Sequence, residues 1–535
     1  MLMSGCEKNE MVSEHQNGKS GPMQVHATTL ENTWYSCYSG PICIGYENRV
    51  ITELHYEDEK AGVSTKKLRL GASSHLEVSR FEEVTSADIQ HLENLAADGK
   101  LLDFHTSVKM GGVPMEYAGF IKEPGDAPPF LEMEIQTFEK KERITLPVPE
   151  LSAEMKTEKI VSPQGAHGVE FLLRKNGIQP GEKWCFVRLE PTILRFMKVR
   201  LECLPVELVS FPDGRQFPLY PVKVVSEVIP PAGETQSPAA EPEIRQEETF
   251  WVDGKGVIWK RYTPIMQMMY WRCGREEAIR NSAEKKVLAG ADGAVSEVSP
   301  DGGMPGPDFG VEMSVPIRNF SESAAENTRT RAETVYRIYA SAENVTDFTE
   351  VFPDSDFQKK KIFTENGKTF AEITVFRSTE SPRDGFRAAA PTEKDVSASN
   401  LIQWDAPKIV EIAESVAPGE TDAGKIAAEL EKFVYRFITN KNYSRGFVTA
   451  AEVAEIPARM AQGLILVPAE EKFVWHVWNE CYIDGRWRPY DATVGGGCVG
   501  GDHIRINAGD FDYSSLAVTL FPVAKLAGKL EIEMR

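Results

Sequence analysis

Several features are scarce or missing in this sequence of 535 residues. No apolar run reaches the roughly 18 residues that a membrane-spanning helix needs. The eight cysteines are scattered, with no Cys-x-x-Cys pair and no Cys/His cluster at zinc-binding spacing, so no metal site or cofactor is predicted. Basic residues are the minority, because 60 Lys and Arg stand against 80 Asp and Glu. The resulting net charge of −20 argues against nucleic acid or an anionic membrane surface as an electrostatic partner.

The composition is that of a globular chain with several domains. Apolar residues make up 41% of the sequence and charged residues 26%, which is typical of folded proteins rather than of disordered ones. The length is too great for a single hydrophobic core and predicts about three domains. The fold class predicted is therefore multidomain α+β.

The first large region, residues 24–287, is predicted to be rich in antiparallel β-structure. Short apolar runs separated by Gly and Pro recur along it, beginning with a hairpin around Gly40-Pro41. The run Val-Glu-Phe-Leu at 169–172 is predicted to be a further strand of this series. Such a series indicates a large antiparallel sheet or half-barrel. The sheet could cradle a lipid or a peptide, or it could serve only as a scaffold.

A linker rich in Gly, Asp and Pro at 288–310 separates this region from a second β-rich module at 311–398. Two strand-like runs flank Asn366-Gly367, which is a strong hairpin signal and predicts a β-sandwich-like module. Residues 399–535 then change to an α+β pattern. Six apolar residues recur there at helical spacing and predict one face of a helix: Ile426, Leu430, Phe433, Val434, Phe437 and Ile438.

The most informative motifs lie between residues 456 and 493. They are Ile-Pro-Ala-Arg at 456–459, His-Val-Trp-Asn-Glu at 476–480 and Trp-Arg-Pro-Tyr-Asp-Ala-Thr at 487–493. The intervening Asp484-Gly485 pair predicts a tight turn between two antiparallel strands that carry His476 and Asp491. An imidazole beside a carboxylate is the proton-shuttling half of a thiol catalytic triad.

These motifs, in this order, closely resemble the second half of the bacterial transglutaminase-like domain of exported proteins, which has a papain-like fold. The resemblance implies that His476 and Asp491 are two members of a Cys-His-Asp triad and that Trp478 flanks the site. Each residue also has a structural interpretation. His476 could be a hydrogen-bonded core histidine, Asp491 a turn cap and Trp478 ordinary core.

The nucleophile that the resemblance implies is missing. In the family, a Phe-x-Thr-Ala-x-Glu-Val segment leads into Gly-Asp-Cys and a long helix before the Ile-Pro-Ala-Arg turn. Here the first segment stands at 447–453, and only Ala454 and Glu455 separate it from Ile456. About 20 residues, enough for a central helix of about 30 Å, are absent. We therefore expect strain or poor packing from Val453 to Ile456, and loss of cover over the sheet face that carries His476.

Two cysteines are close enough in the sequence to be considered as substitutes. Cys481 follows His476 by five residues, and an odd offset along a strand places two side chains on opposite faces. Cys498 lies in a glycine-rich loop after Asp491, where nothing would hold it in position for catalysis. Neither is predicted to be the nucleophile.

The resemblance implies a domain that was ancestrally an acyl-transfer or amide-hydrolysing enzyme acting on protein or peptide amides. Without a nucleophile, this domain is predicted to be inactive as written. One alternative is a non-catalytic binding or structural protein of the cell envelope. Another is an active thiol peptidase or transglutaminase, if the missing segment is an artefact of the sequence or the gene. The oligomeric state is not predicted.

The N-terminal residues give an expectation about location. Met-Leu-Met-Ser-Gly-Cys at 1–6 is similar to the end of a bacterial lipoprotein signal, in which the cysteine, here Cys6, becomes lipidated. A polar segment to residue 23 would then be the tether of an extracytoplasmic, membrane-anchored protein. A chance match is the alternative. Cys37 and Cys43 flank the first hairpin turn, where they would either form a bridge in an exported protein or remain two buried thiols.

If Cys6 is lipidated, the DNA upstream of Met1 should encode basic residues followed by about ten apolar ones in the same frame. The native protein should then be recovered with membranes, and Cys6→Ser should move it to the soluble fraction. Sequencing the locus and fractionating cells check this expectation. A stop codon directly upstream of Met1, or recovery of the native protein from the cytoplasm, would contradict it.

Overall fold

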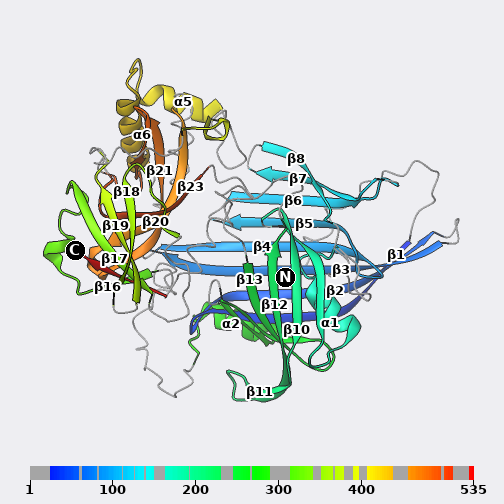
Figure 1. Cartoon of the computed structure of the whole chain (residues 1–535). Helices are drawn as coiled ribbons and strands as arrows, with labels where there is room; N and C mark the ends of the chain where they lie inside the picture. Colours follow the sequence, from blue (N-terminus) through cyan, green and yellow to red (C-terminus); the bar gives the residue numbers. More distant parts are fainter. Residues whose placement is uncertain are drawn as a thin grey trace.

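The computed structural model shows a chain built mainly from two large β-sheets, with few helices (Figure 1). Among the residues that it describes, no helix is both long and apolar enough to cross a membrane. The described residues are 24–58, 63–80, 83–110, 113–125, 127–137, 140–149, 163–191, 193–229, 245–264, 268–288, 314–340, 351–365, 368–378, 390–396, 407–437, 456–495, 499–509 and 529–535.

The first sheet has 15 strands in the order β8-β7-β6-β5-β4-β3-β2-β1-β15-β14-β13-β12-β10-β9, with β11 paired to β12. Long hairpins follow one another from β1 to β8, as the predicted antiparallel series requires. The strands are β1 Gln24–Ser39, β2 Ile42–Asp58, β3 Val63–Arg80, β4 Glu83–Ala96, β5 Leu101–Met110, β6 Val113–Lys122, β7 Phe130–Thr137, β8 Lys140–Pro147, β9 Lys183–Glu190, β10 Arg195–Cys203, β11 Glu207–Ser210, β12 Gln216–Val228, β13 Arg245–Val252, β14 Ile258–Thr263 and β15 Met268–Cys273.

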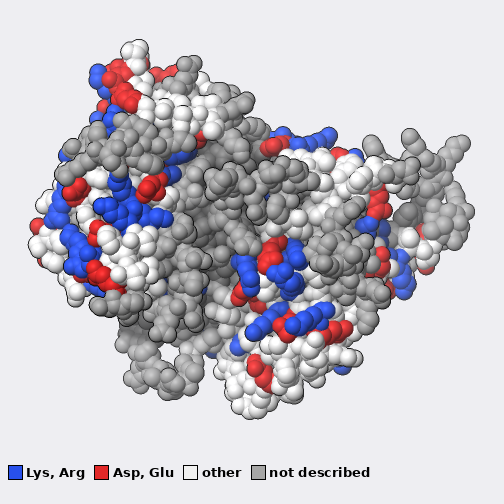
Figure 2. All heavy atoms as spheres, in the orientation of Figure 1, with Lys and Arg blue, Asp and Glu red and all other residues white. Residues whose placement is uncertain are grey.

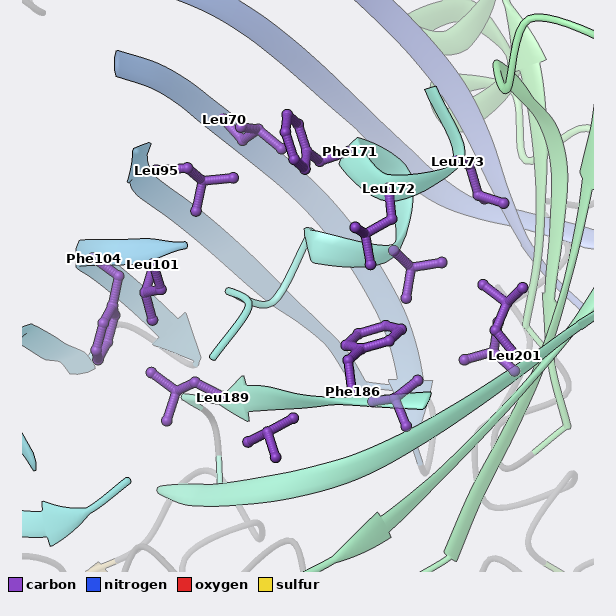
Figure 3. Packing of buried hydrophobic residues seen from close by; sticks show 14 of the residues in the cluster. Leu70, Leu95, Leu101, Phe104, Phe171, Leu172, Leu173, Phe186, Leu189 and Leu201 are labelled. Carbon is purple, nitrogen blue, oxygen red and sulfur yellow. The ribbon is translucent and has the colours of Figure 1, made fainter. Parts of the chain in front are cut away.

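This sheet folds over on itself and encloses one hydrophobic core. Side chains from β3 to β5 face side chains from β9 and β10, with the helix α1 Gly168–Asn176 between them (Figure 3). The run at 169–172, which we predicted to be a strand, belongs to this helix. A run of four residues, three of them apolar, is too short to distinguish the two structures. Here Val169, Leu172 and Leu173 recur at helical spacing, and all three are buried in the core.

The first hairpin settles the state of two cysteines. Cys37 lies opposite Gly45 and Cys43 lies opposite Tyr38, so the register does not pair the two cysteines with each other. Both are buried and unbridged. Burial raises the pKa of the Cys43 thiol to about 11. Cys37 and Cys43 are therefore two buried thiols in the structure and do not form a disulfide bridge. A second helix, α2 Arg275–Ala283, packs against β1 and β2.

The second sheet has nine strands in the order β18-β19-β17-β24-β16-β21-β20-β23, with β22 paired to β21. The strands are β16 Ser314–Arg318, β17 Glu333–Ala340, β18 Gln358–Glu365, β19 Lys368–Phe376, β20 Ala458–Val467, β21 Lys472–Ile483, β22 Arg486–Tyr490, β23 His503–Gly509 and β24 Leu530–Met534. The hairpin predicted around Asn366-Gly367 is β18–β19.

The strands of the predicted module at 311–398 and those of the predicted domain at 399–535 belong to this one sheet. β24 lies between β17 and β16, and β16 in turn lies beside β21. Side chains from both segments share one core cluster, with Tyr336 of β17 packed edge to face against Phe473 of β21. The boundary that we predicted at 398/399 is therefore not a boundary between sheets.

Two helices, α5 Pro407–Val416 and α6 Ala423–Phe437, cover one side of the second sheet near β21 and β22. The helix predicted from apolar spacing is α6, whose Leu430 and Val434 are buried against Cys481, Ile483 and Tyr490. Ile438 lies outside the described residues. Short helical turns complete the described elements: α4 Glu322–Ala325, η4 Glu393–Val396 and η5 Pro468–Glu470.

On the face shown in Figure 2, basic and acidic side chains of the described residues lie interspersed over both sheets. Many charges of the described residues form pairs, such as Lys122 with Glu132 and Arg337 with Glu372. The acidic excess of the sequence therefore does not form one large acidic patch on the described part of this face.

The interior of the first sheet holds a network of buried ion pairs. Arg49 lies 2.6 Å from Glu47 and 2.8 Å from Glu170, and Arg261 lies 3.1 Å from Glu47. Glu47, Arg49 and Glu170 are 6%, 7% and 4% exposed. Burial by itself would raise the pKa of Glu47, but Arg261 and Arg49 outweigh it and lower this pKa to about 2.

This lowered pKa predicts an acid-sensitive contribution to stability. Because the pKa of Glu47 is lower in the folded chain, ionised Glu47 stabilises the fold above about pH 4.5, and this contribution is lost as the pH falls toward 2. Between pH 6 and pH 3 the wild type should lose about 2 kcal/mol more unfolding free energy than Glu47→Gln does. Urea unfolding measures both. The matched control is Glu57→Gln, at an exposed position of the same strand, and equal pH dependence in wild type and Glu47→Gln would contradict the assignment.

Candidate functional site

The site is built on the hairpin β21–β22, which the sequence predicted. Its turn consists of Asp484 and Gly485, both with positive φ (54° and 76°), as a two-residue hairpin turn requires. The turn places Asn479 of β21 opposite Tyr490, the last residue of β22. Asp491 follows directly and turns back toward His476.

The structure brings the two residues of the predicted pair together. The distance from His476 Nε2 to Asp491 Oδ2 is 2.9 Å, inside the range of a hydrogen bond. The pair is deeply buried, with His476 6% exposed and Asp491 1% exposed. The expected loss of cover over this sheet face is therefore wrong for His476. It is wrong as well for Trp478, which is 2% exposed.

Trp478 lies beside the pair as the resemblance implied. Its ring is nearly parallel to that of His476, with the centroids 6.4 Å apart. Its edge meets a second imidazole, that of His503, at a centroid distance of 5.1 Å and an angle of 80°. Trp478 therefore forms one wall around both imidazoles.

His503 is a member of the site that sequence reasoning missed. It begins β23, and its Nε2 lies 3.1 Å from Asp491 Oδ2, the same oxygen that His476 contacts. A glycine permits this approach, because Gly463 of β20 lies opposite His476. A Cβ at Gly463 would lie 2.0 Å from the carbonyl oxygen of Ile504 in β23. His503 is 12 residues beyond Asp491 and belongs to no motif, so no local signal indicated it.

Thr493 also contacts Asp491, as the turn-cap interpretation of this carboxylate anticipated. Its backbone N–H and its hydroxyl both donate to Asp491 Oδ1, at 2.9 and 2.6 Å. Its hydroxyl also lies 3.1 Å from His476 Nε2. Asp491 thus does cap a turn toward Thr493, one of the alternatives considered, while its second oxygen faces the two imidazoles.

A second carboxylate lies behind His503. Asp502 Oδ1 lies 3.0 Å from His503 Nδ1, and Arg329 donates to Asp502 Oδ2 at 2.7 Å. Burial alone would lower the pKa of His503, but Asp502 and Asp491 outweigh it and raise this pKa to about 9. The His503 imidazolium in turn helps to hold the pKa of Asp502 below its ordinary range, against the effect of burial. His503 is therefore an imidazolium between two carboxylates at neutral pH.

The carboxylate of Asp491 stays ionised for the same kind of reason. Its burial would raise its pKa, but His476 and His503 outweigh that effect and hold it well below the ordinary range. The three groups His476, Asp491 and His503 each offer a donor atom, and these atoms lie within 4.8 Å of one another. They could therefore hold a metal ion, which the sequence, lacking any local metal-binding spacing, did not predict.

The structure does not bring Cys481 to this site. Cys481 is fully buried in the cluster under α5 and α6, beside Ala427 and Leu430. Alternation along β21 places it on the face opposite His476, as predicted. Cys6, Cys498 and the segment from Val453 to Glu455 lie outside the described residues. Ile456, which ends that segment, is packed into the same cluster and is 3% exposed.

Comparisons with known proteins support part of the resemblance. A family model described as the transglutaminase-like superfamily matches residues 439–492, a segment that contains His476 and Asp491 but not His503. No curated protein matches the chain. One similar solved structure is a "Putative Cysteine Protease from Cytophaga hutchinsonii", with 14% identity and a TM-score of 0.22 over 38% of this chain and 81% of that one. Another is a beta-barrel-like protein of a domain of unknown function from Brucella abortus, with 10% identity and a TM-score of 0.24 over 45% and 93% of the two chains.

The shared carboxylate makes a prediction about stability. Asp491→Asn removes the charge that faces the two imidazoles and should lower the free energy of unfolding by about 3–5 kcal/mol, the usual cost of breaking a buried ion pair. Asp484→Asn, in the neighbouring turn with its side chain 74% exposed, is the matched control and should change it by less than about 0.5 kcal/mol. Chemical unfolding followed by circular dichroism measures both. Equal effects of the two substitutions would show that Asp491 does not hold the site together.

Proposed function

We propose that residues 399–535 form a transglutaminase-like domain that has lost thiol catalysis, in a protein that serves a binding or structural role in the cell envelope. The family match to 439–492 supports the kind of domain. The observation that carries the loss of catalysis is the position of Cys481, on the face of β21 opposite His476 and beneath two helices. No other cysteine stands between residues 274 and 497 of the sequence.

The orientation of His476 supports a triad ancestry. In a thiol triad one imidazole nitrogen faces the carboxylate while the other takes the proton of the nucleophile. Here Nε2 faces Asp491, so Nδ1 is the nitrogen that a thiol would need to approach. The sequence places no cysteine between 438 and 455, the stretch in which the family carries its nucleophile. The arrangement therefore retains the orienting half of the machinery without the reacting atom.

The folded first sheet supports the proposed binding or structural role. It covers more of the chain than the transglutaminase-like segment does, and its interior is filled by one apolar core together with the ion pairs of Glu47 and Arg49. A sheet filled in this way is suited to act as a rigid scaffold, which is the plainer of the two roles considered for it. Location in the cell envelope stays a prediction that rests on residues 1–6 and their similarity to the end of a lipoprotein signal.

The proposal predicts that the purified full chain neither hydrolyses nor cross-links peptide amides. An alkylating probe should label wild type and His476→Ala equally, because no thiol depends on this imidazole for its reactivity. His75→Ala, which removes a half-buried histidine from the first sheet, is the matched control. Labelling is measured by mass spectrometry of tryptic peptides, and turnover by release of ammonia from a glutamine peptide.

One result would overturn the proposal: turnover of the amide substrate together with labelling that disappears in His476→Ala but persists in His75→Ala. The Cys498→Ser variant would then identify the reacting residue. If activity were lost in that variant as well, the loop cysteine would be the nucleophile. If activity survived, a thiol elsewhere in the chain would be acting with His476.

A further inference from the structure

We propose that His476, Asp491 and His503 form a binding site for a divalent transition-metal ion of the zinc class. Their three donor atoms are His476 Nε2, Asp491 Oδ2 and His503 Nε2, and all lie within 4.8 Å of one another. Each of the three residues is buried. Two imidazoles with one carboxylate are a ligand set that Zn²⁺ and its neighbours in the first transition series prefer, whereas Ca²⁺ and Mg²⁺ favour sites made of oxygen.

The separations between the donor atoms suit an ion placed among them. Zinc lies about 2.0–2.2 Å from imidazole nitrogen and carboxylate oxygen, so neighbouring ligand atoms around it are about 2.9–3.5 Å apart. The two imidazole nitrogens lie 2.9 and 3.1 Å from Asp491 Oδ2. An ion bound there would replace the protons that these contacts now share. The hydroxyl of Thr493, 3.1 Å from His476 Nε2, is a further oxygen beside these donor atoms.

The surroundings of the three ligands already have the form of an outer shell. Metal-bound histidine usually has its other ring nitrogen beside a carboxylate, which fixes the ring orientation. Here Asp502 Oδ1 lies 3.0 Å from His503 Nδ1, and Arg329 holds Asp502 in place. Thr493 holds the far oxygen of Asp491 with two hydrogen bonds, which aims Oδ2 at the imidazoles. Both ligands are thus oriented by neighbours that do not themselves need to touch the ion.

The local charge also favours a cation. Three carboxylates lie within this buried region, those of Asp491, Asp502 and Glu431. Glu431 of α6 accepts a hydrogen bond from the backbone N–H of Asp491 at 3.3 Å. Arg329 is the cationic side chain that compensates Asp502. Because a ligand imidazole must be neutral, a divalent ion would displace the proton of the His503 imidazolium and would offset the charge of Asp491 and Asp502 in its place.

The inference extends beyond the loss of catalysis proposed above and does not depend on it. The family match ends at residue 492, so it does not include His503, the residue that turns a histidine–aspartate pair into three ligands. A bound ion would engage His476 Nε2 and Asp491 Oδ2 and would fix them as a structural centre that joins β21, β22 and β23.

The test uses the full chain, freed of metal with a chelator and titrated with Zn²⁺ at neutral pH by calorimetry and by competition with a chromophoric chelator. We expect one tight site per chain. Co²⁺ bound there should show the visible absorption of a site with nitrogen and oxygen ligands. Asp502→Asn, which leaves all three ligands in place, should weaken Zn²⁺ binding roughly 10–100-fold. His503→Gln and His476→Gln should weaken it by more than that.

Two controls keep the result interpretable. His75→Gln removes a half-buried histidine of the first sheet that lies 2.7 Å from Asp88 and 3.4 Å from Glu77, and it should leave Zn²⁺ binding unchanged. Circular dichroism identifies any ligand variant that fails to fold, in which case Asp502→Asn and the Co²⁺ spectrum decide. The inference is overturned if wild type binds no Zn²⁺ tightly. It is also overturned if folded His503→Gln and Asp502→Asn bind as wild type does. The amide-turnover assay reports on the loss of catalysis separately.

Discussion

The carboxylate of Asp491 is the group on which the second sheet's interior depends. One of its oxygens faces two imidazoles, from β21 and β23, and the other is held by the backbone and hydroxyl of Thr493. A buried ionised carboxylate without partners would cost several kcal/mol, comparable with the whole net stability of a domain. The strands that carry its partners are therefore not free to shift, since a one-residue slip would turn His476 to the opposite face.

Because the fold depends on the Asp491 carboxylate, stability alone can account for the retention of His476 and Asp491. The three side chains are almost completely covered, and the carboxylate of a working triad is buried as well. Once Asp491 is buried, substitution of His476 or His503 removes one of the two imidazoles that offset its charge. Folding stability alone therefore opposes the loss of these residues. A retained pair is consequently weak support for retained catalysis.

The parts of the fold that local sequence determines were predictable. The Asp484-Gly485 turn fixes the hairpin and with it the meeting of His476 with Asp491, and apolar spacing identified α6. His503 could not be found in this way, because its contact with Asp491 depends on β23 pairing with β20 across the sheet. The run at 169–172 was too short for its periodicity to decide between helix and strand. Its helical form is selected by packing against both halves of the folded sheet.

The division predicted at residue 398 separates strands that belong to one sheet. The contacts that join these strands are between residues far apart in the sequence, so local sequence did not indicate them. Tyr336 donates its hydroxyl hydrogen bond to the carbonyl of Gly501, and Gln358 donates to that of Arg505. The absence of a side chain at Gly501 lets this residue lie close to β17, because a Cβ there would lie 2.1 Å from the hydroxyl oxygen of Thr334.

Arg329 connects these contacts to the site. It reaches from the segment before β17 to Asp502, the carboxylate behind His503, and to the carbonyl of Gly495. The segment that sequence analysis assigned to a separate module therefore supplies the cation that orients the outer part of the site. Without Arg329, the buried Asp502 carboxylate would keep as partners the His503 imidazolium and the backbone N–H of Gly500. The site and the strands at 314–376 consequently form one cooperative structure, in which a change at Arg329 acts on His503 through Asp502.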